Sequence, residues 1–459
     1  MLNSKDLPVI LSSSGIKVKV NLLEVLNFRE KDLPEWKFCT DSRSIFTNSW
    51  FIALKGPNFD GHSFIKKAIE SGATGLIISE REKVSDVDLP TLLVKDTLDA
   101  YQTIARFHRN FLKPKVIGIT GSNGKTTTKE IVFQVLSTKF KCLASEANEN
   151  NEIGVPKNLL KIDQNVEIFI QEMGMRGLGQ IEELVKIAEQ DYSIITNIGV
   201  AHIGILGSKE KIAEAKAEIF IHQPLGTTAI VPRDEPLLLK WKSKRKNDLK
   251  FLEFGGYENP KFINGEMRFS YRNNEYCFKS PNIALIDNCC AAIDLAIELG
   301  LTHAQIQYGL NQYEAQAGRG KLIKLQSGAI LIDETYNANP DSVEALAKSM
   351  KILCPNKRKV IFLGEMAELD WKEEELMNWL QYNIVGFVDE VVFIGGKASP
   401  IEKLPSLSVK YFNKKETAEK YIFKNSQQYL SEGCLIGVKG SRMAKMETLI
   451  DSFRGFHFA

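Results

Sequence analysis

The sequence predicts an α/β protein of three domains. The prediction rests on the chain length, on two separate series of alternating strands and helices, and on a glycine-rich loop between a strand and a helix. The chain has 459 residues, which is too many for a single domain, because domains of about 100–200 residues are typical. Hydrophobic residues make up 44% and charged residues 25%, as in a folded globular protein. We expect domain limits of 1–112, 113–317 and 318–459.

Strands and helices alternate in a different manner in each third of the chain. The first third has short strands at 49–54, 75–79 and 91–94, helical periodicity at 63–71, and a helix over 98–112 that joins it to the next region. The middle third has strands at 116–120, 166–172 and 192–196, helices at 126–140, 208–221 and 287–300, and short strands between 232 and 278. Such alternation is typical of a parallel sheet.

A second alternating series begins after Arg319. It predicts strands at 329–333, 359–363, 390–394 and 435–438, with helices between them. Asp341 and Glu344 follow Pro340 and are interpreted as a capping box that opens a helix over 342–353.

Composition disfavours several classes of function. A net charge of +2 provides no basic field for nucleic acid. Seven cysteines without a C-x-x-C pair argue against a zinc or thioredoxin-type site, and reduced thiols fit the cytoplasm. The first residues show no signal peptide, and no apolar run of about 18 residues predicts a membrane span. We therefore expect a cytoplasmic monomer without a nucleic-acid partner.

The segment Gly-Ser-Asn-Gly-Lys-Thr-Thr-Thr over 121–128 lies between a predicted strand and a predicted helix. Gly121 and Gly124 allow a tight turn whose N–H groups point inward, and the helix N-terminus adds partial positive charge. Lys125 can contact β- and γ-phosphates, and the Thr126 hydroxyl can ligate Mg²⁺. This P-loop is short, since residue 119 is Ile rather than Gly. The alternative is a chance glycine turn, and the loop alone indicates nucleotide binding rather than a ligase.

Polar residues follow two further strands of the middle region. Glu172 ends one strand and His202 follows another. Ligands bind beyond the carboxyl ends of parallel strands, so we expect Thr126, Glu172 and His202 on one rim as metal ligands. Mg²⁺ prefers oxygen to imidazole, which argues against His202. The alternatives are an exposed carboxylate and a hydrogen-bonded loop histidine.

Lys216 lies on the apolar stripe of its predicted helix, four residues after Ile212 and three before Ile219. A buried lysine has a depressed pKa and can act as a neutral nucleophile. Our hypothesis is that its amine captures CO₂ as a carbamate, which can ligate a metal. The alternative is a lysine that extends its charged end to the surface.

These residues are part of a longer pattern that resembles the Mur ligases of bacterial cell-wall synthesis, over nearly the whole chain. The P-loop is widely shared, whereas the blocks 150–156 and 336–340 are typical of one branch of that family. The matching blocks are Asp41–Arg43, Phe51–Gly56, Asp60–His62, Thr120–Lys129, Asn148–Pro156, Thr196–His202, Ala215–Phe220, Asp287–Asn288, Gly318–Arg319, Thr335–Ser342, Leu363–Met366 and Lys439–Arg442.

The resemblance implies a small N-terminal α/β precursor-binding domain, a central P-loop ATPase domain with a mostly parallel sheet, and a C-terminal Rossmann-like domain. For this branch it implies an ATP-dependent peptide ligase of peptidoglycan synthesis. The implied reaction joins D-alanyl-D-alanine to UDP-N-acetylmuramoyl-tripeptide through an acyl phosphate. The implied cofactors are ATP, two Mg²⁺ ions and a CO₂-derived carbamate on Lys216.

The resemblance also assigns roles to individual residues. The implied catalytic residues are Lys125, Glu172, His202, Lys216 and Arg319. The implied ATP-binding residues are Gly121, Ser122, Asn123, Gly124, Lys125, Thr126, Thr127, Asn288, Arg319, Asp333, Tyr336 and Asn337. The implied substrate-binding residues are Asp41, Ser42, Arg43, Lys55, Asp60, His62, Asn150, Asn151, Glu152 and Asn339. The implied metal ligands are Thr126, Glu172, His202 and carbamylated Lys216.

Three other functions share parts of this pattern. A folylpolyglutamate synthase has a similar ATPase core but different specificity blocks from those at 150–156. A non-catalytic nucleotide-binding protein would not need the P-loop together with Glu172, His202 and Lys216. A P-loop motor or transport ATPase is disfavoured by the precursor-type first domain.

Overall fold

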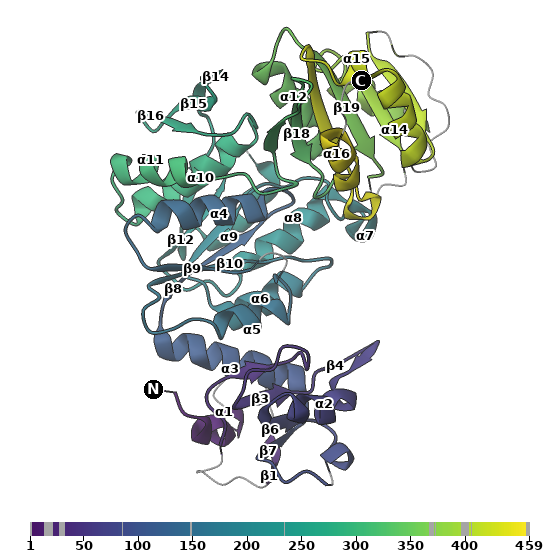
Figure 1. Cartoon of the computed structure of the whole chain (residues 1–459). Helices are drawn as coiled ribbons and strands as arrows, with labels where there is room; N and C mark the ends of the chain where they lie inside the picture. Colours follow the sequence, from purple (N-terminus) through teal and green to yellow (C-terminus); the bar gives the residue numbers. More distant parts are fainter. Residues whose placement is uncertain are drawn as a thin grey trace.

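The computed structural model describes residues 2–12, 22–26, 33–84, 86–146, 149–233, 235–366, 371, 373–395, 404 and 406–455. Within these ranges, three larger sheets follow one another along the chain, and helices accompany each of them (Figure 1). We call each sheet with its helices the N-terminal, central and C-terminal unit. The predicted α/β class with three successive units is confirmed.

The N-terminal unit contains a five-stranded sheet in the order β1-β7-β6-β3-β2, in which only β1 is antiparallel to its neighbour. Its strands are β1 (Leu22–Leu26), β2 (Phe38–Cys39), β3 (Ser49–Ile52), β6 (Ala73–Ile78) and β7 (Thr91–Val94). Its shorter elements are α1 (Leu7–Ser12), α2 (Ile65–Glu70) and the β4–β5 hairpin (Lys55–Gly56 and Phe59–Asp60). The strands β3, β6 and β7 confirm three sequence predictions.

Helix α3 (Thr97–Leu112) joins the N-terminal unit to the central one (Figure 1). Asp96 caps its start by accepting hydrogen bonds from two backbone N–H groups. The Arg109 guanidinium donates to the Glu189 carbonyl at 2.8 Å. His108 lies between the two units: its Nδ1 accepts from Trp36 Nε1 at 3.0 Å, and its Nε2 is 2.8 Å from the carbonyl oxygen of Ile162.

The His108 contacts predict a pH-dependent stability. Because Nδ1 accepts from Trp36, the ring is neutral, and burial lowers its pKa below the ordinary value. As the pH falls, His108 therefore takes up a proton near pH 6.5 in the unfolded chain, whereas in the folded chain it stays neutral to a lower pH. The contribution of His108 to the free energy of unfolding is expected to be fully present above about pH 6.5. Below that pH it should fall by at most about 1.4 kcal/mol per pH unit, until the lowered pKa is reached.

Urea unfolding at pH 7.5 and pH 5 measures this loss, with His108→Gln as the matched variant. A glutamine can still accept from Trp36 and donate to Ile162, but it does not titrate. The variant should lose less stability than the wild type on acidification. An equal loss in both proteins contradicts the assignment.

The central unit contains a six-stranded, all-parallel sheet in the order β13-β12-β11-β8-β10-β9. Its strands are β8 (Lys115–Thr120), β9 (Cys142–Ala144), β10 (Ile168–Glu172), β11 (Tyr192–Ile195), β12 (Thr227–Pro232) and β13 (Leu249–Phe254). Both faces are covered, as a parallel sheet requires. In β8, Ile117 packs with the apolar core of one face and Val116 with that of the other.

Helices cover the two faces of the central sheet. One face carries α4 (Lys125–Leu136), α10 (Leu285–Glu298) and α11 (His303–Gln312), and the other carries α5 (Gly154–Leu159), α6 (Gln180–Ala188) and α8 (Lys209–Ala217). The central unit also contains α7 (Ile203–Leu206), α9 (Leu239–Arg245) and an antiparallel sheet of β14 (Glu258–Ile263), β15 (Glu266–Tyr271) and β16 (Asn274–Phe278).

The C-terminal unit contains a six-stranded sheet in the order β17-β18-β22-β19-β20-β21, in which only the edge strand β17 is antiparallel. Its strands are β17 (Lys321–Lys324), β18 (Ile330–Glu334), β19 (Arg358–Gly364), β20 (Glu390–Ile394), β21 (Ser408–Phe412) and β22 (Cys434–Lys439). Its helices are α12 (Pro340–Leu353), α13 (Glu373–Asn383), α14 (Lys415–Lys424), α15 (Ser426–Tyr429) and α16 (Glu447–Arg454).

The predicted capping box of Asp341 and Glu344 is wrong. Asn339 is the N-cap of α12, and it exchanges hydrogen bonds with Ser342 at 3.0 and 3.1 Å. Pro340 occupies the first helical position, where its fixed φ suits the helix and its missing N–H costs nothing, so the N-cap is Asn339, two residues before the predicted Asp341. Asp341 is thereby left to make another contact.

Two predicted helices also end earlier than expected. The helix expected over 126–140 ends at Leu136. The helix expected over 208–221 becomes a 3₁₀ turn after Ala217. Helix α11 was not predicted at all. Among the described residues, no helix combines the length and the apolarity needed to cross a membrane.

A candidate active site between the P-loop and the C-terminal unit

The P-loop has the backbone form that its glycines predict. Gly121 has a φ of +151° and Gly124 a φ of +76°, and α4 begins at Lys125. A Cβ on Gly121 would lie only 1.8 Å from Thr196 Oγ1. Lys125 Nζ donates to the Gly121 carbonyl at 2.9 Å, so the side chain folds back over its own loop. The loop therefore presents a lysine and a helix N-terminus together, which is the arrangement that binds phosphate.

Replacing Gly124 with alanine is expected to lower ATP-dependent turnover by at least about tenfold. Alanine at a φ of +76° costs about 1–2 kcal/mol, and its Cβ would meet Asn288 Oδ1 at 3.0 Å. Gly226 is the matched control, since it has the same φ of +76° and a Cβ added there would have no atom within 4 Å. Gly226→Ala should show the same stability loss with normal turnover. Equal turnover in the two variants, measured by ADP release, contradicts a role for this loop geometry.

Thr126 and Glu172 meet at the base of the loop. Thr126 Oγ1 donates to Glu172 Oε2 at 2.6 Å, and Asn150 Nδ2 donates to Glu172 Oε1 at 2.8 Å. Glu172 ends β10, which pairs with β8, so the sheet itself brings the two residues together. A hydroxyl and a carboxylate are the oxygen ligands that Mg²⁺ takes. These residues therefore fit a magnesium ion.

Lys216 is buried on α8, with 2% of its surface exposed, which excludes the surface-extended alternative. Its pKa is lowered well below the ordinary value, first by burial and then by the charge of Lys125. Burial also lowers the pKa of Lys125, and the Arg319 charge lowers it further while Glu172 raises it. Lys125 thus faces the like charge of Arg319, and its own charge disfavours protonation of Lys216.

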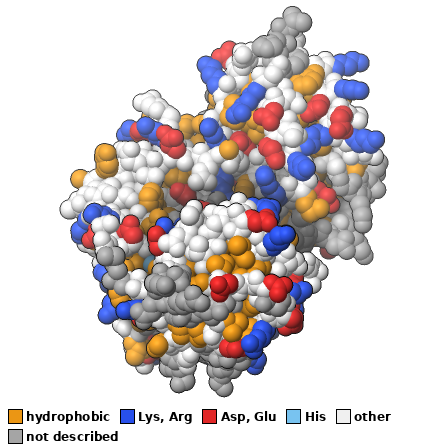
Figure 2. Space-filling model, turned by 60° about the horizontal axis from the view of Figure 1, so that its bottom comes forward, with side chains coloured by type: hydrophobic (Ala, Val, Ile, Leu, Met, Phe, Trp, Pro, Cys, Tyr) orange, Lys and Arg blue, Asp and Glu red, His pale blue; other side chains and the backbone are white. Residues whose placement is uncertain are grey.

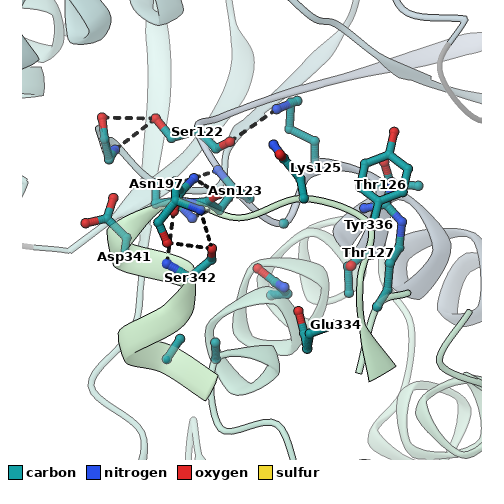
Figure 3. A pocket seen from close by; sticks show the side chains of 18 of the residues that line it. Ser122, Asn123, Lys125, Thr126, Thr127, Asn197, Glu334, Tyr336, Asp341 and Ser342 are labelled. Carbon is teal, nitrogen blue, oxygen red and sulfur yellow. Dashed lines mark hydrogen bonds between the residues drawn. The ribbon is translucent and has the colours of Figure 1, made fainter. Parts of the chain in front are cut away.

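A cavity of about 470 Å³ opens over the P-loop, and it is lined by the central and C-terminal units together (Figure 3). The predicted residues that line it are Ser122, Asn123, Gly124, Lys125, Thr126, Thr127, Asn150, Glu172, Asn288, Arg319, Tyr336, Asn337 and Asn339. The predicted residues outside its lining are Asp41, Ser42, Arg43, Lys55, Asp60, His62, Gly121, Asn151, Glu152, His202, Lys216 and Asp333. His202 lies at the start of α7 with a φ of +67°.

Asp333 shapes the wall of the cavity from behind. Its Oδ2 accepts from the Gly318 N–H at 2.8 Å and its Oδ1 from the Thr335 hydroxyl at 2.7 Å. The turn that it holds carries Arg319, whose guanidinium lies 3.7 Å from the ring centre of Tyr336. Successive strand residues point to opposite faces, so the neighbouring Glu334 lines the cavity instead.

Six polar residues that sequence reasoning missed also line the cavity: Asn197, Asn282, Glu334, Asp341, Ser342 and Lys439. Lys439 Nζ lies 3.0 Å from Glu334 Oε2, and Asn282 Nδ2 donates to Glu334 Oε1 at 3.0 Å. Glu334 and Lys439 are register partners of β18 and β22. Only the strand order brings them together, although both occur in or beside the motif blocks.

Residues 150–152 lie where the central unit meets α3. Asn151 Oδ1 accepts from the Gly154 N–H at 2.9 Å, which holds the turn before α5, and the Glu152 carbonyl accepts from Gln102 of α3 at 3.1 Å. Of the three, only Asn150 reaches the cavity.

The predicted precursor residues form two groups in the N-terminal unit. Arg43 pairs with Asp41 at 2.7 Å, and this hydrogen-bonded pair lowers the pKa of the Asp41 carboxyl to about 2. Lys157 of α5 adds to that shift, so the group faces the central unit. In the space-filling view, Lys and Arg side chains border the hollow between the N-terminal unit and the others (Figure 2).

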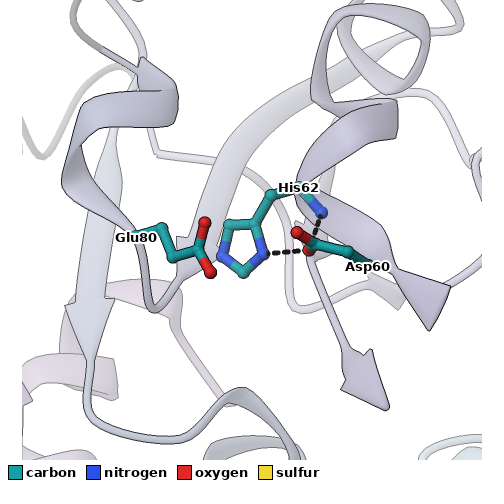
Figure 4. A group of neighbouring side chains, drawn as sticks. All are labelled: Asp60, His62 and Glu80. Carbon is teal, nitrogen blue, oxygen red and sulfur yellow. Dashed lines mark hydrogen bonds and ion pairs between the residues drawn. The ribbon is translucent and has the colours of Figure 1, made fainter. Parts of the chain in front are cut away.

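The second group surrounds the buried ring of His62 (Figure 4). His62 Nε2 accepts from the Ser79 N–H at 3.0 Å, so Nδ1 carries the proton and donates to Asp60 at 2.7 Å. Glu80 lies within 4.8 Å but pairs with Lys55. All these groups already have partners, so the cluster stabilises the hairpin rather than providing open metal ligands.

Comparison with known proteins matches the chain to three family models in succession. The models are the Mur ligase family, catalytic domain, at 38–109, the Mur ligase middle domain at 119–290, and the Mur ligase, glutamate ligase domain, at 318–442. A UDP-N-acetylmuramoyl-tripeptide--D-alanyl-D-alanine ligase of Synechocystis sp. is 40% identical over 357 residues, or 76% of each chain.

Two solved structures resemble the whole fold. A crystal structure of MurF from Acinetobacter baumannii is 29% identical, has a TM-score of 0.82 and covers 92% of this chain and 93% of its own. MurF ligase from Thermotoga maritima, in complex with ADP, is 26% identical, has a TM-score of 0.79 and covers 93% of this chain and 98% of its own. In sequence, in the order of its domains and in fold, the chain belongs to the Mur ligase family.

Proposed function

We propose that this protein is an ATP-dependent ligase that joins D-alanyl-D-alanine to UDP-N-acetylmuramoyl-tripeptide in peptidoglycan synthesis. The observation that carries the proposal is the pair of oxygen ligands in the cavity, where Thr126 Oγ1 lies 2.6 Å from Glu172 Oε2. Lys125 and Arg319 line the same cavity. The substrates follow from the names of the relatives, and the ADP bound in the Thermotoga MurF supports ATP as the energy source.

ATP would lie along the P-loop with its triphosphate against the start of α4. The repulsion between Lys125 and Arg319 supports this placement, because a bound polyanion relieves it. Asn288, Tyr336 and Asn337 would hold the rest of the nucleotide, and Asp333 would act through the Gly318 turn. Mg²⁺ held by Thr126 and Glu172 would supply positive charge to the phosphate oxygens.

The reaction needs two anions to approach each other. The precursor carboxylate attacks the γ-phosphorus, ADP leaves, and an acyl phosphate forms. The dipeptide amine then adds to the acyl carbon, loses a proton, and the amide forms as phosphate departs. Lys125 and Arg319 neutralise the negative charge of the phosphoryl group while it is transferred. Because Arg319 and Asn339 come from the C-terminal unit, the cavity can also keep water from the acyl phosphate.

Lys216 is proposed to carry a carbamate. A buried amine with a lowered pKa is neutral, so its nitrogen can add to CO₂ and release one proton. The reaction replaces a neutral amine with an anion close to Lys125. Together with His202, the carbamate would provide ligands of a second Mg²⁺.

The N-terminal unit is proposed to bind the UDP-precursor through Asp41, Ser42, Arg43, Lys55, Asp60 and His62, with Asn150, Asn151 and Glu152 at the junction and Asn339 near the dipeptide. The proposed domain limits are 1–112, 113–317 and 318–459, since α3 ends at Leu112 and the Gly318 turn starts the third sheet. Seven free cysteines suit a cytoplasmic site of action.

The decisive experiment is a product assay with ATP, D-alanyl-D-alanine and either the lysine or the meso-diaminopimelate tripeptide precursor. Mass spectrometry should show one pentapeptide formed for each ADP released, and omission of either substrate should stop ADP release. ADP release without a pentapeptide, or ligation of glutamate to a folate, would contradict the proposal.

A further inference from the structure

The start of α12 is hydrogen-bonded to the P-loop region of the central unit. The Val200 N–H donates to Asp341 Oδ2 at 3.0 Å, and Asn339 Nδ2 donates to Asn123 Oδ1 at 2.7 Å. Figure 3 shows Asp341 and Ser342 beside Asn123 and Asn197. Two side chains of one helix turn thus link the C-terminal unit to two loops of the central unit.

These two central loops behave as one hydrogen-bonded body. Asn123 N–H donates to Asn197 Oδ1 at 2.9 Å, and Thr196 Oγ1 donates to the Asn123 carbonyl at 2.6 Å. The Gly199 N–H donates to Ser122 Oγ at 2.9 Å. A helix that docks on residue 200 therefore also holds the P-loop, and it holds the segment that leads to His202.

Gly199 makes room for this contact. A Cβ on Gly199 would lie 2.3 Å from Asp341 Oδ2, closer than any real contact, whereas its approach to Ser122 Cβ would be 3.3 Å. The backbone of Gly199 is not in the left-handed region, so alanine is permitted there by conformation alone. The glycine is needed chiefly because the carboxylate comes so close.

We infer that Asp341 is a positioning residue that couples docking of the C-terminal unit to the placement of the P-loop and the His202 segment. The inference rests on the proposed function and deepens it. The carboxylate accepts from the backbone N–H of Val200, and the proposed chemical steps assign it no role. The contact of Asp341 with Val200 brings Arg319 to the cavity only when the 196–202 segment is hydrogen-bonded to the P-loop.

The inference predicts a loss of turnover rather than of nucleotide affinity. Asp341→Ala is expected to lower kcat about tenfold, the effect of one charge-assisted hydrogen bond, with KM for ATP changed less than about threefold. Asp341→Asn keeps an oxygen acceptor and should retain most of the wild-type kcat. Glu344→Gln is the matched control, since Glu344 lies on the same helix and pairs with Lys348.

A double-mutant cycle with Gly199 separates docking from general damage. Gly199→Ala should lower kcat at least about tenfold, because its Cβ pushes the Asp341 carboxylate away. In the Asp341→Ala background the same change should cost less than about twofold, since the clashing oxygen is gone. If the loss of kcat in the double variant equals the product of the two single losses, the inference is overturned. A wild-type kcat in Asp341→Ala would also overturn it.

Hydrogen exchange tests the docking without relying on ligase activity. In Asp341→Ala, peptides covering 197–202 and 122–124 should exchange faster, while the N-terminal sheet stays unchanged. Unchanged exchange at 197–202 would overturn the inference. If the wild-type protein makes no pentapeptide but this exchange difference appears, the proposed function fails and the docking role of Asp341 stands.

Discussion

The Lys125→Ala variant is expected to lose ATP-dependent ligation by about a thousandfold or more in kcat/KM for ATP. Lys125 lies at the first position of α4 with its ammonium over the P-loop carbonyls. Phosphoryl transfer consists largely of positioning and charge neutralisation, so removal of this cation leaves the γ-phosphate without its nearest positive charge. The assay is pentapeptide formation over a range of ATP concentrations, with the other two substrates saturating.

The thermal stability of the same variant provides a second readout. Without ligand, Lys125 is a desolvated cation repelled by Arg319, so its removal should leave the melting temperature unchanged or raise it. The stabilisation that ATP gives to the wild type should largely disappear, because it depends on affinity for the folded state. Lys186→Ala is the control, since Lys186 forms an exposed pair with Glu182. Full ligation by Lys125→Ala would disprove the P-loop assignment.

The Lys216→Ala variant is expected to lose about a hundredfold or more in kcat and to regain part of it with formate or acetate. If Lys216 works as a carbamate, the variant lacks an anion in a closed pocket, and a small carboxylate can occupy that space. The lowered pKa of this buried amine favours CO₂ capture over protonation. Activity should be measured over a range of carboxylate concentrations.

The Lys211→Ala variant is the matched control for Lys216. Lys211 lies on the same helix, but its side chain is exposed and pairs with Glu214. It should show normal activity and no response to added acids. Depletion of CO₂ should also lower the activity of the wild type and leave Lys216→Ala unaffected. Wild-type activity in Lys216→Ala would remove the carbamate hypothesis.

Local sequence determined the parts of the site that depend on local physics. The glycine spacing of the P-loop requires the left-handed φ seen at Gly124, and helical periodicity placed Lys216 on the buried stripe of α8. Strand, loop and helix follow from periodicity and turn residues, which act over a few neighbouring positions. For this reason the fold class and the nucleotide loop were predictable without a structure.

The tertiary structure decided which distant residues meet. Strand order alone pairs Glu334 with Lys439, and strand alternation turns Glu334 rather than Asp333 toward the cavity. Asp341 looked like a helix cap, but Pro340 moved the cap to Asn339, and the carboxylate contacts Val200 of another unit. Contacts between residues so far apart in the chain depend on how whole sheets and helices pack, and no local pattern in the sequence records that packing.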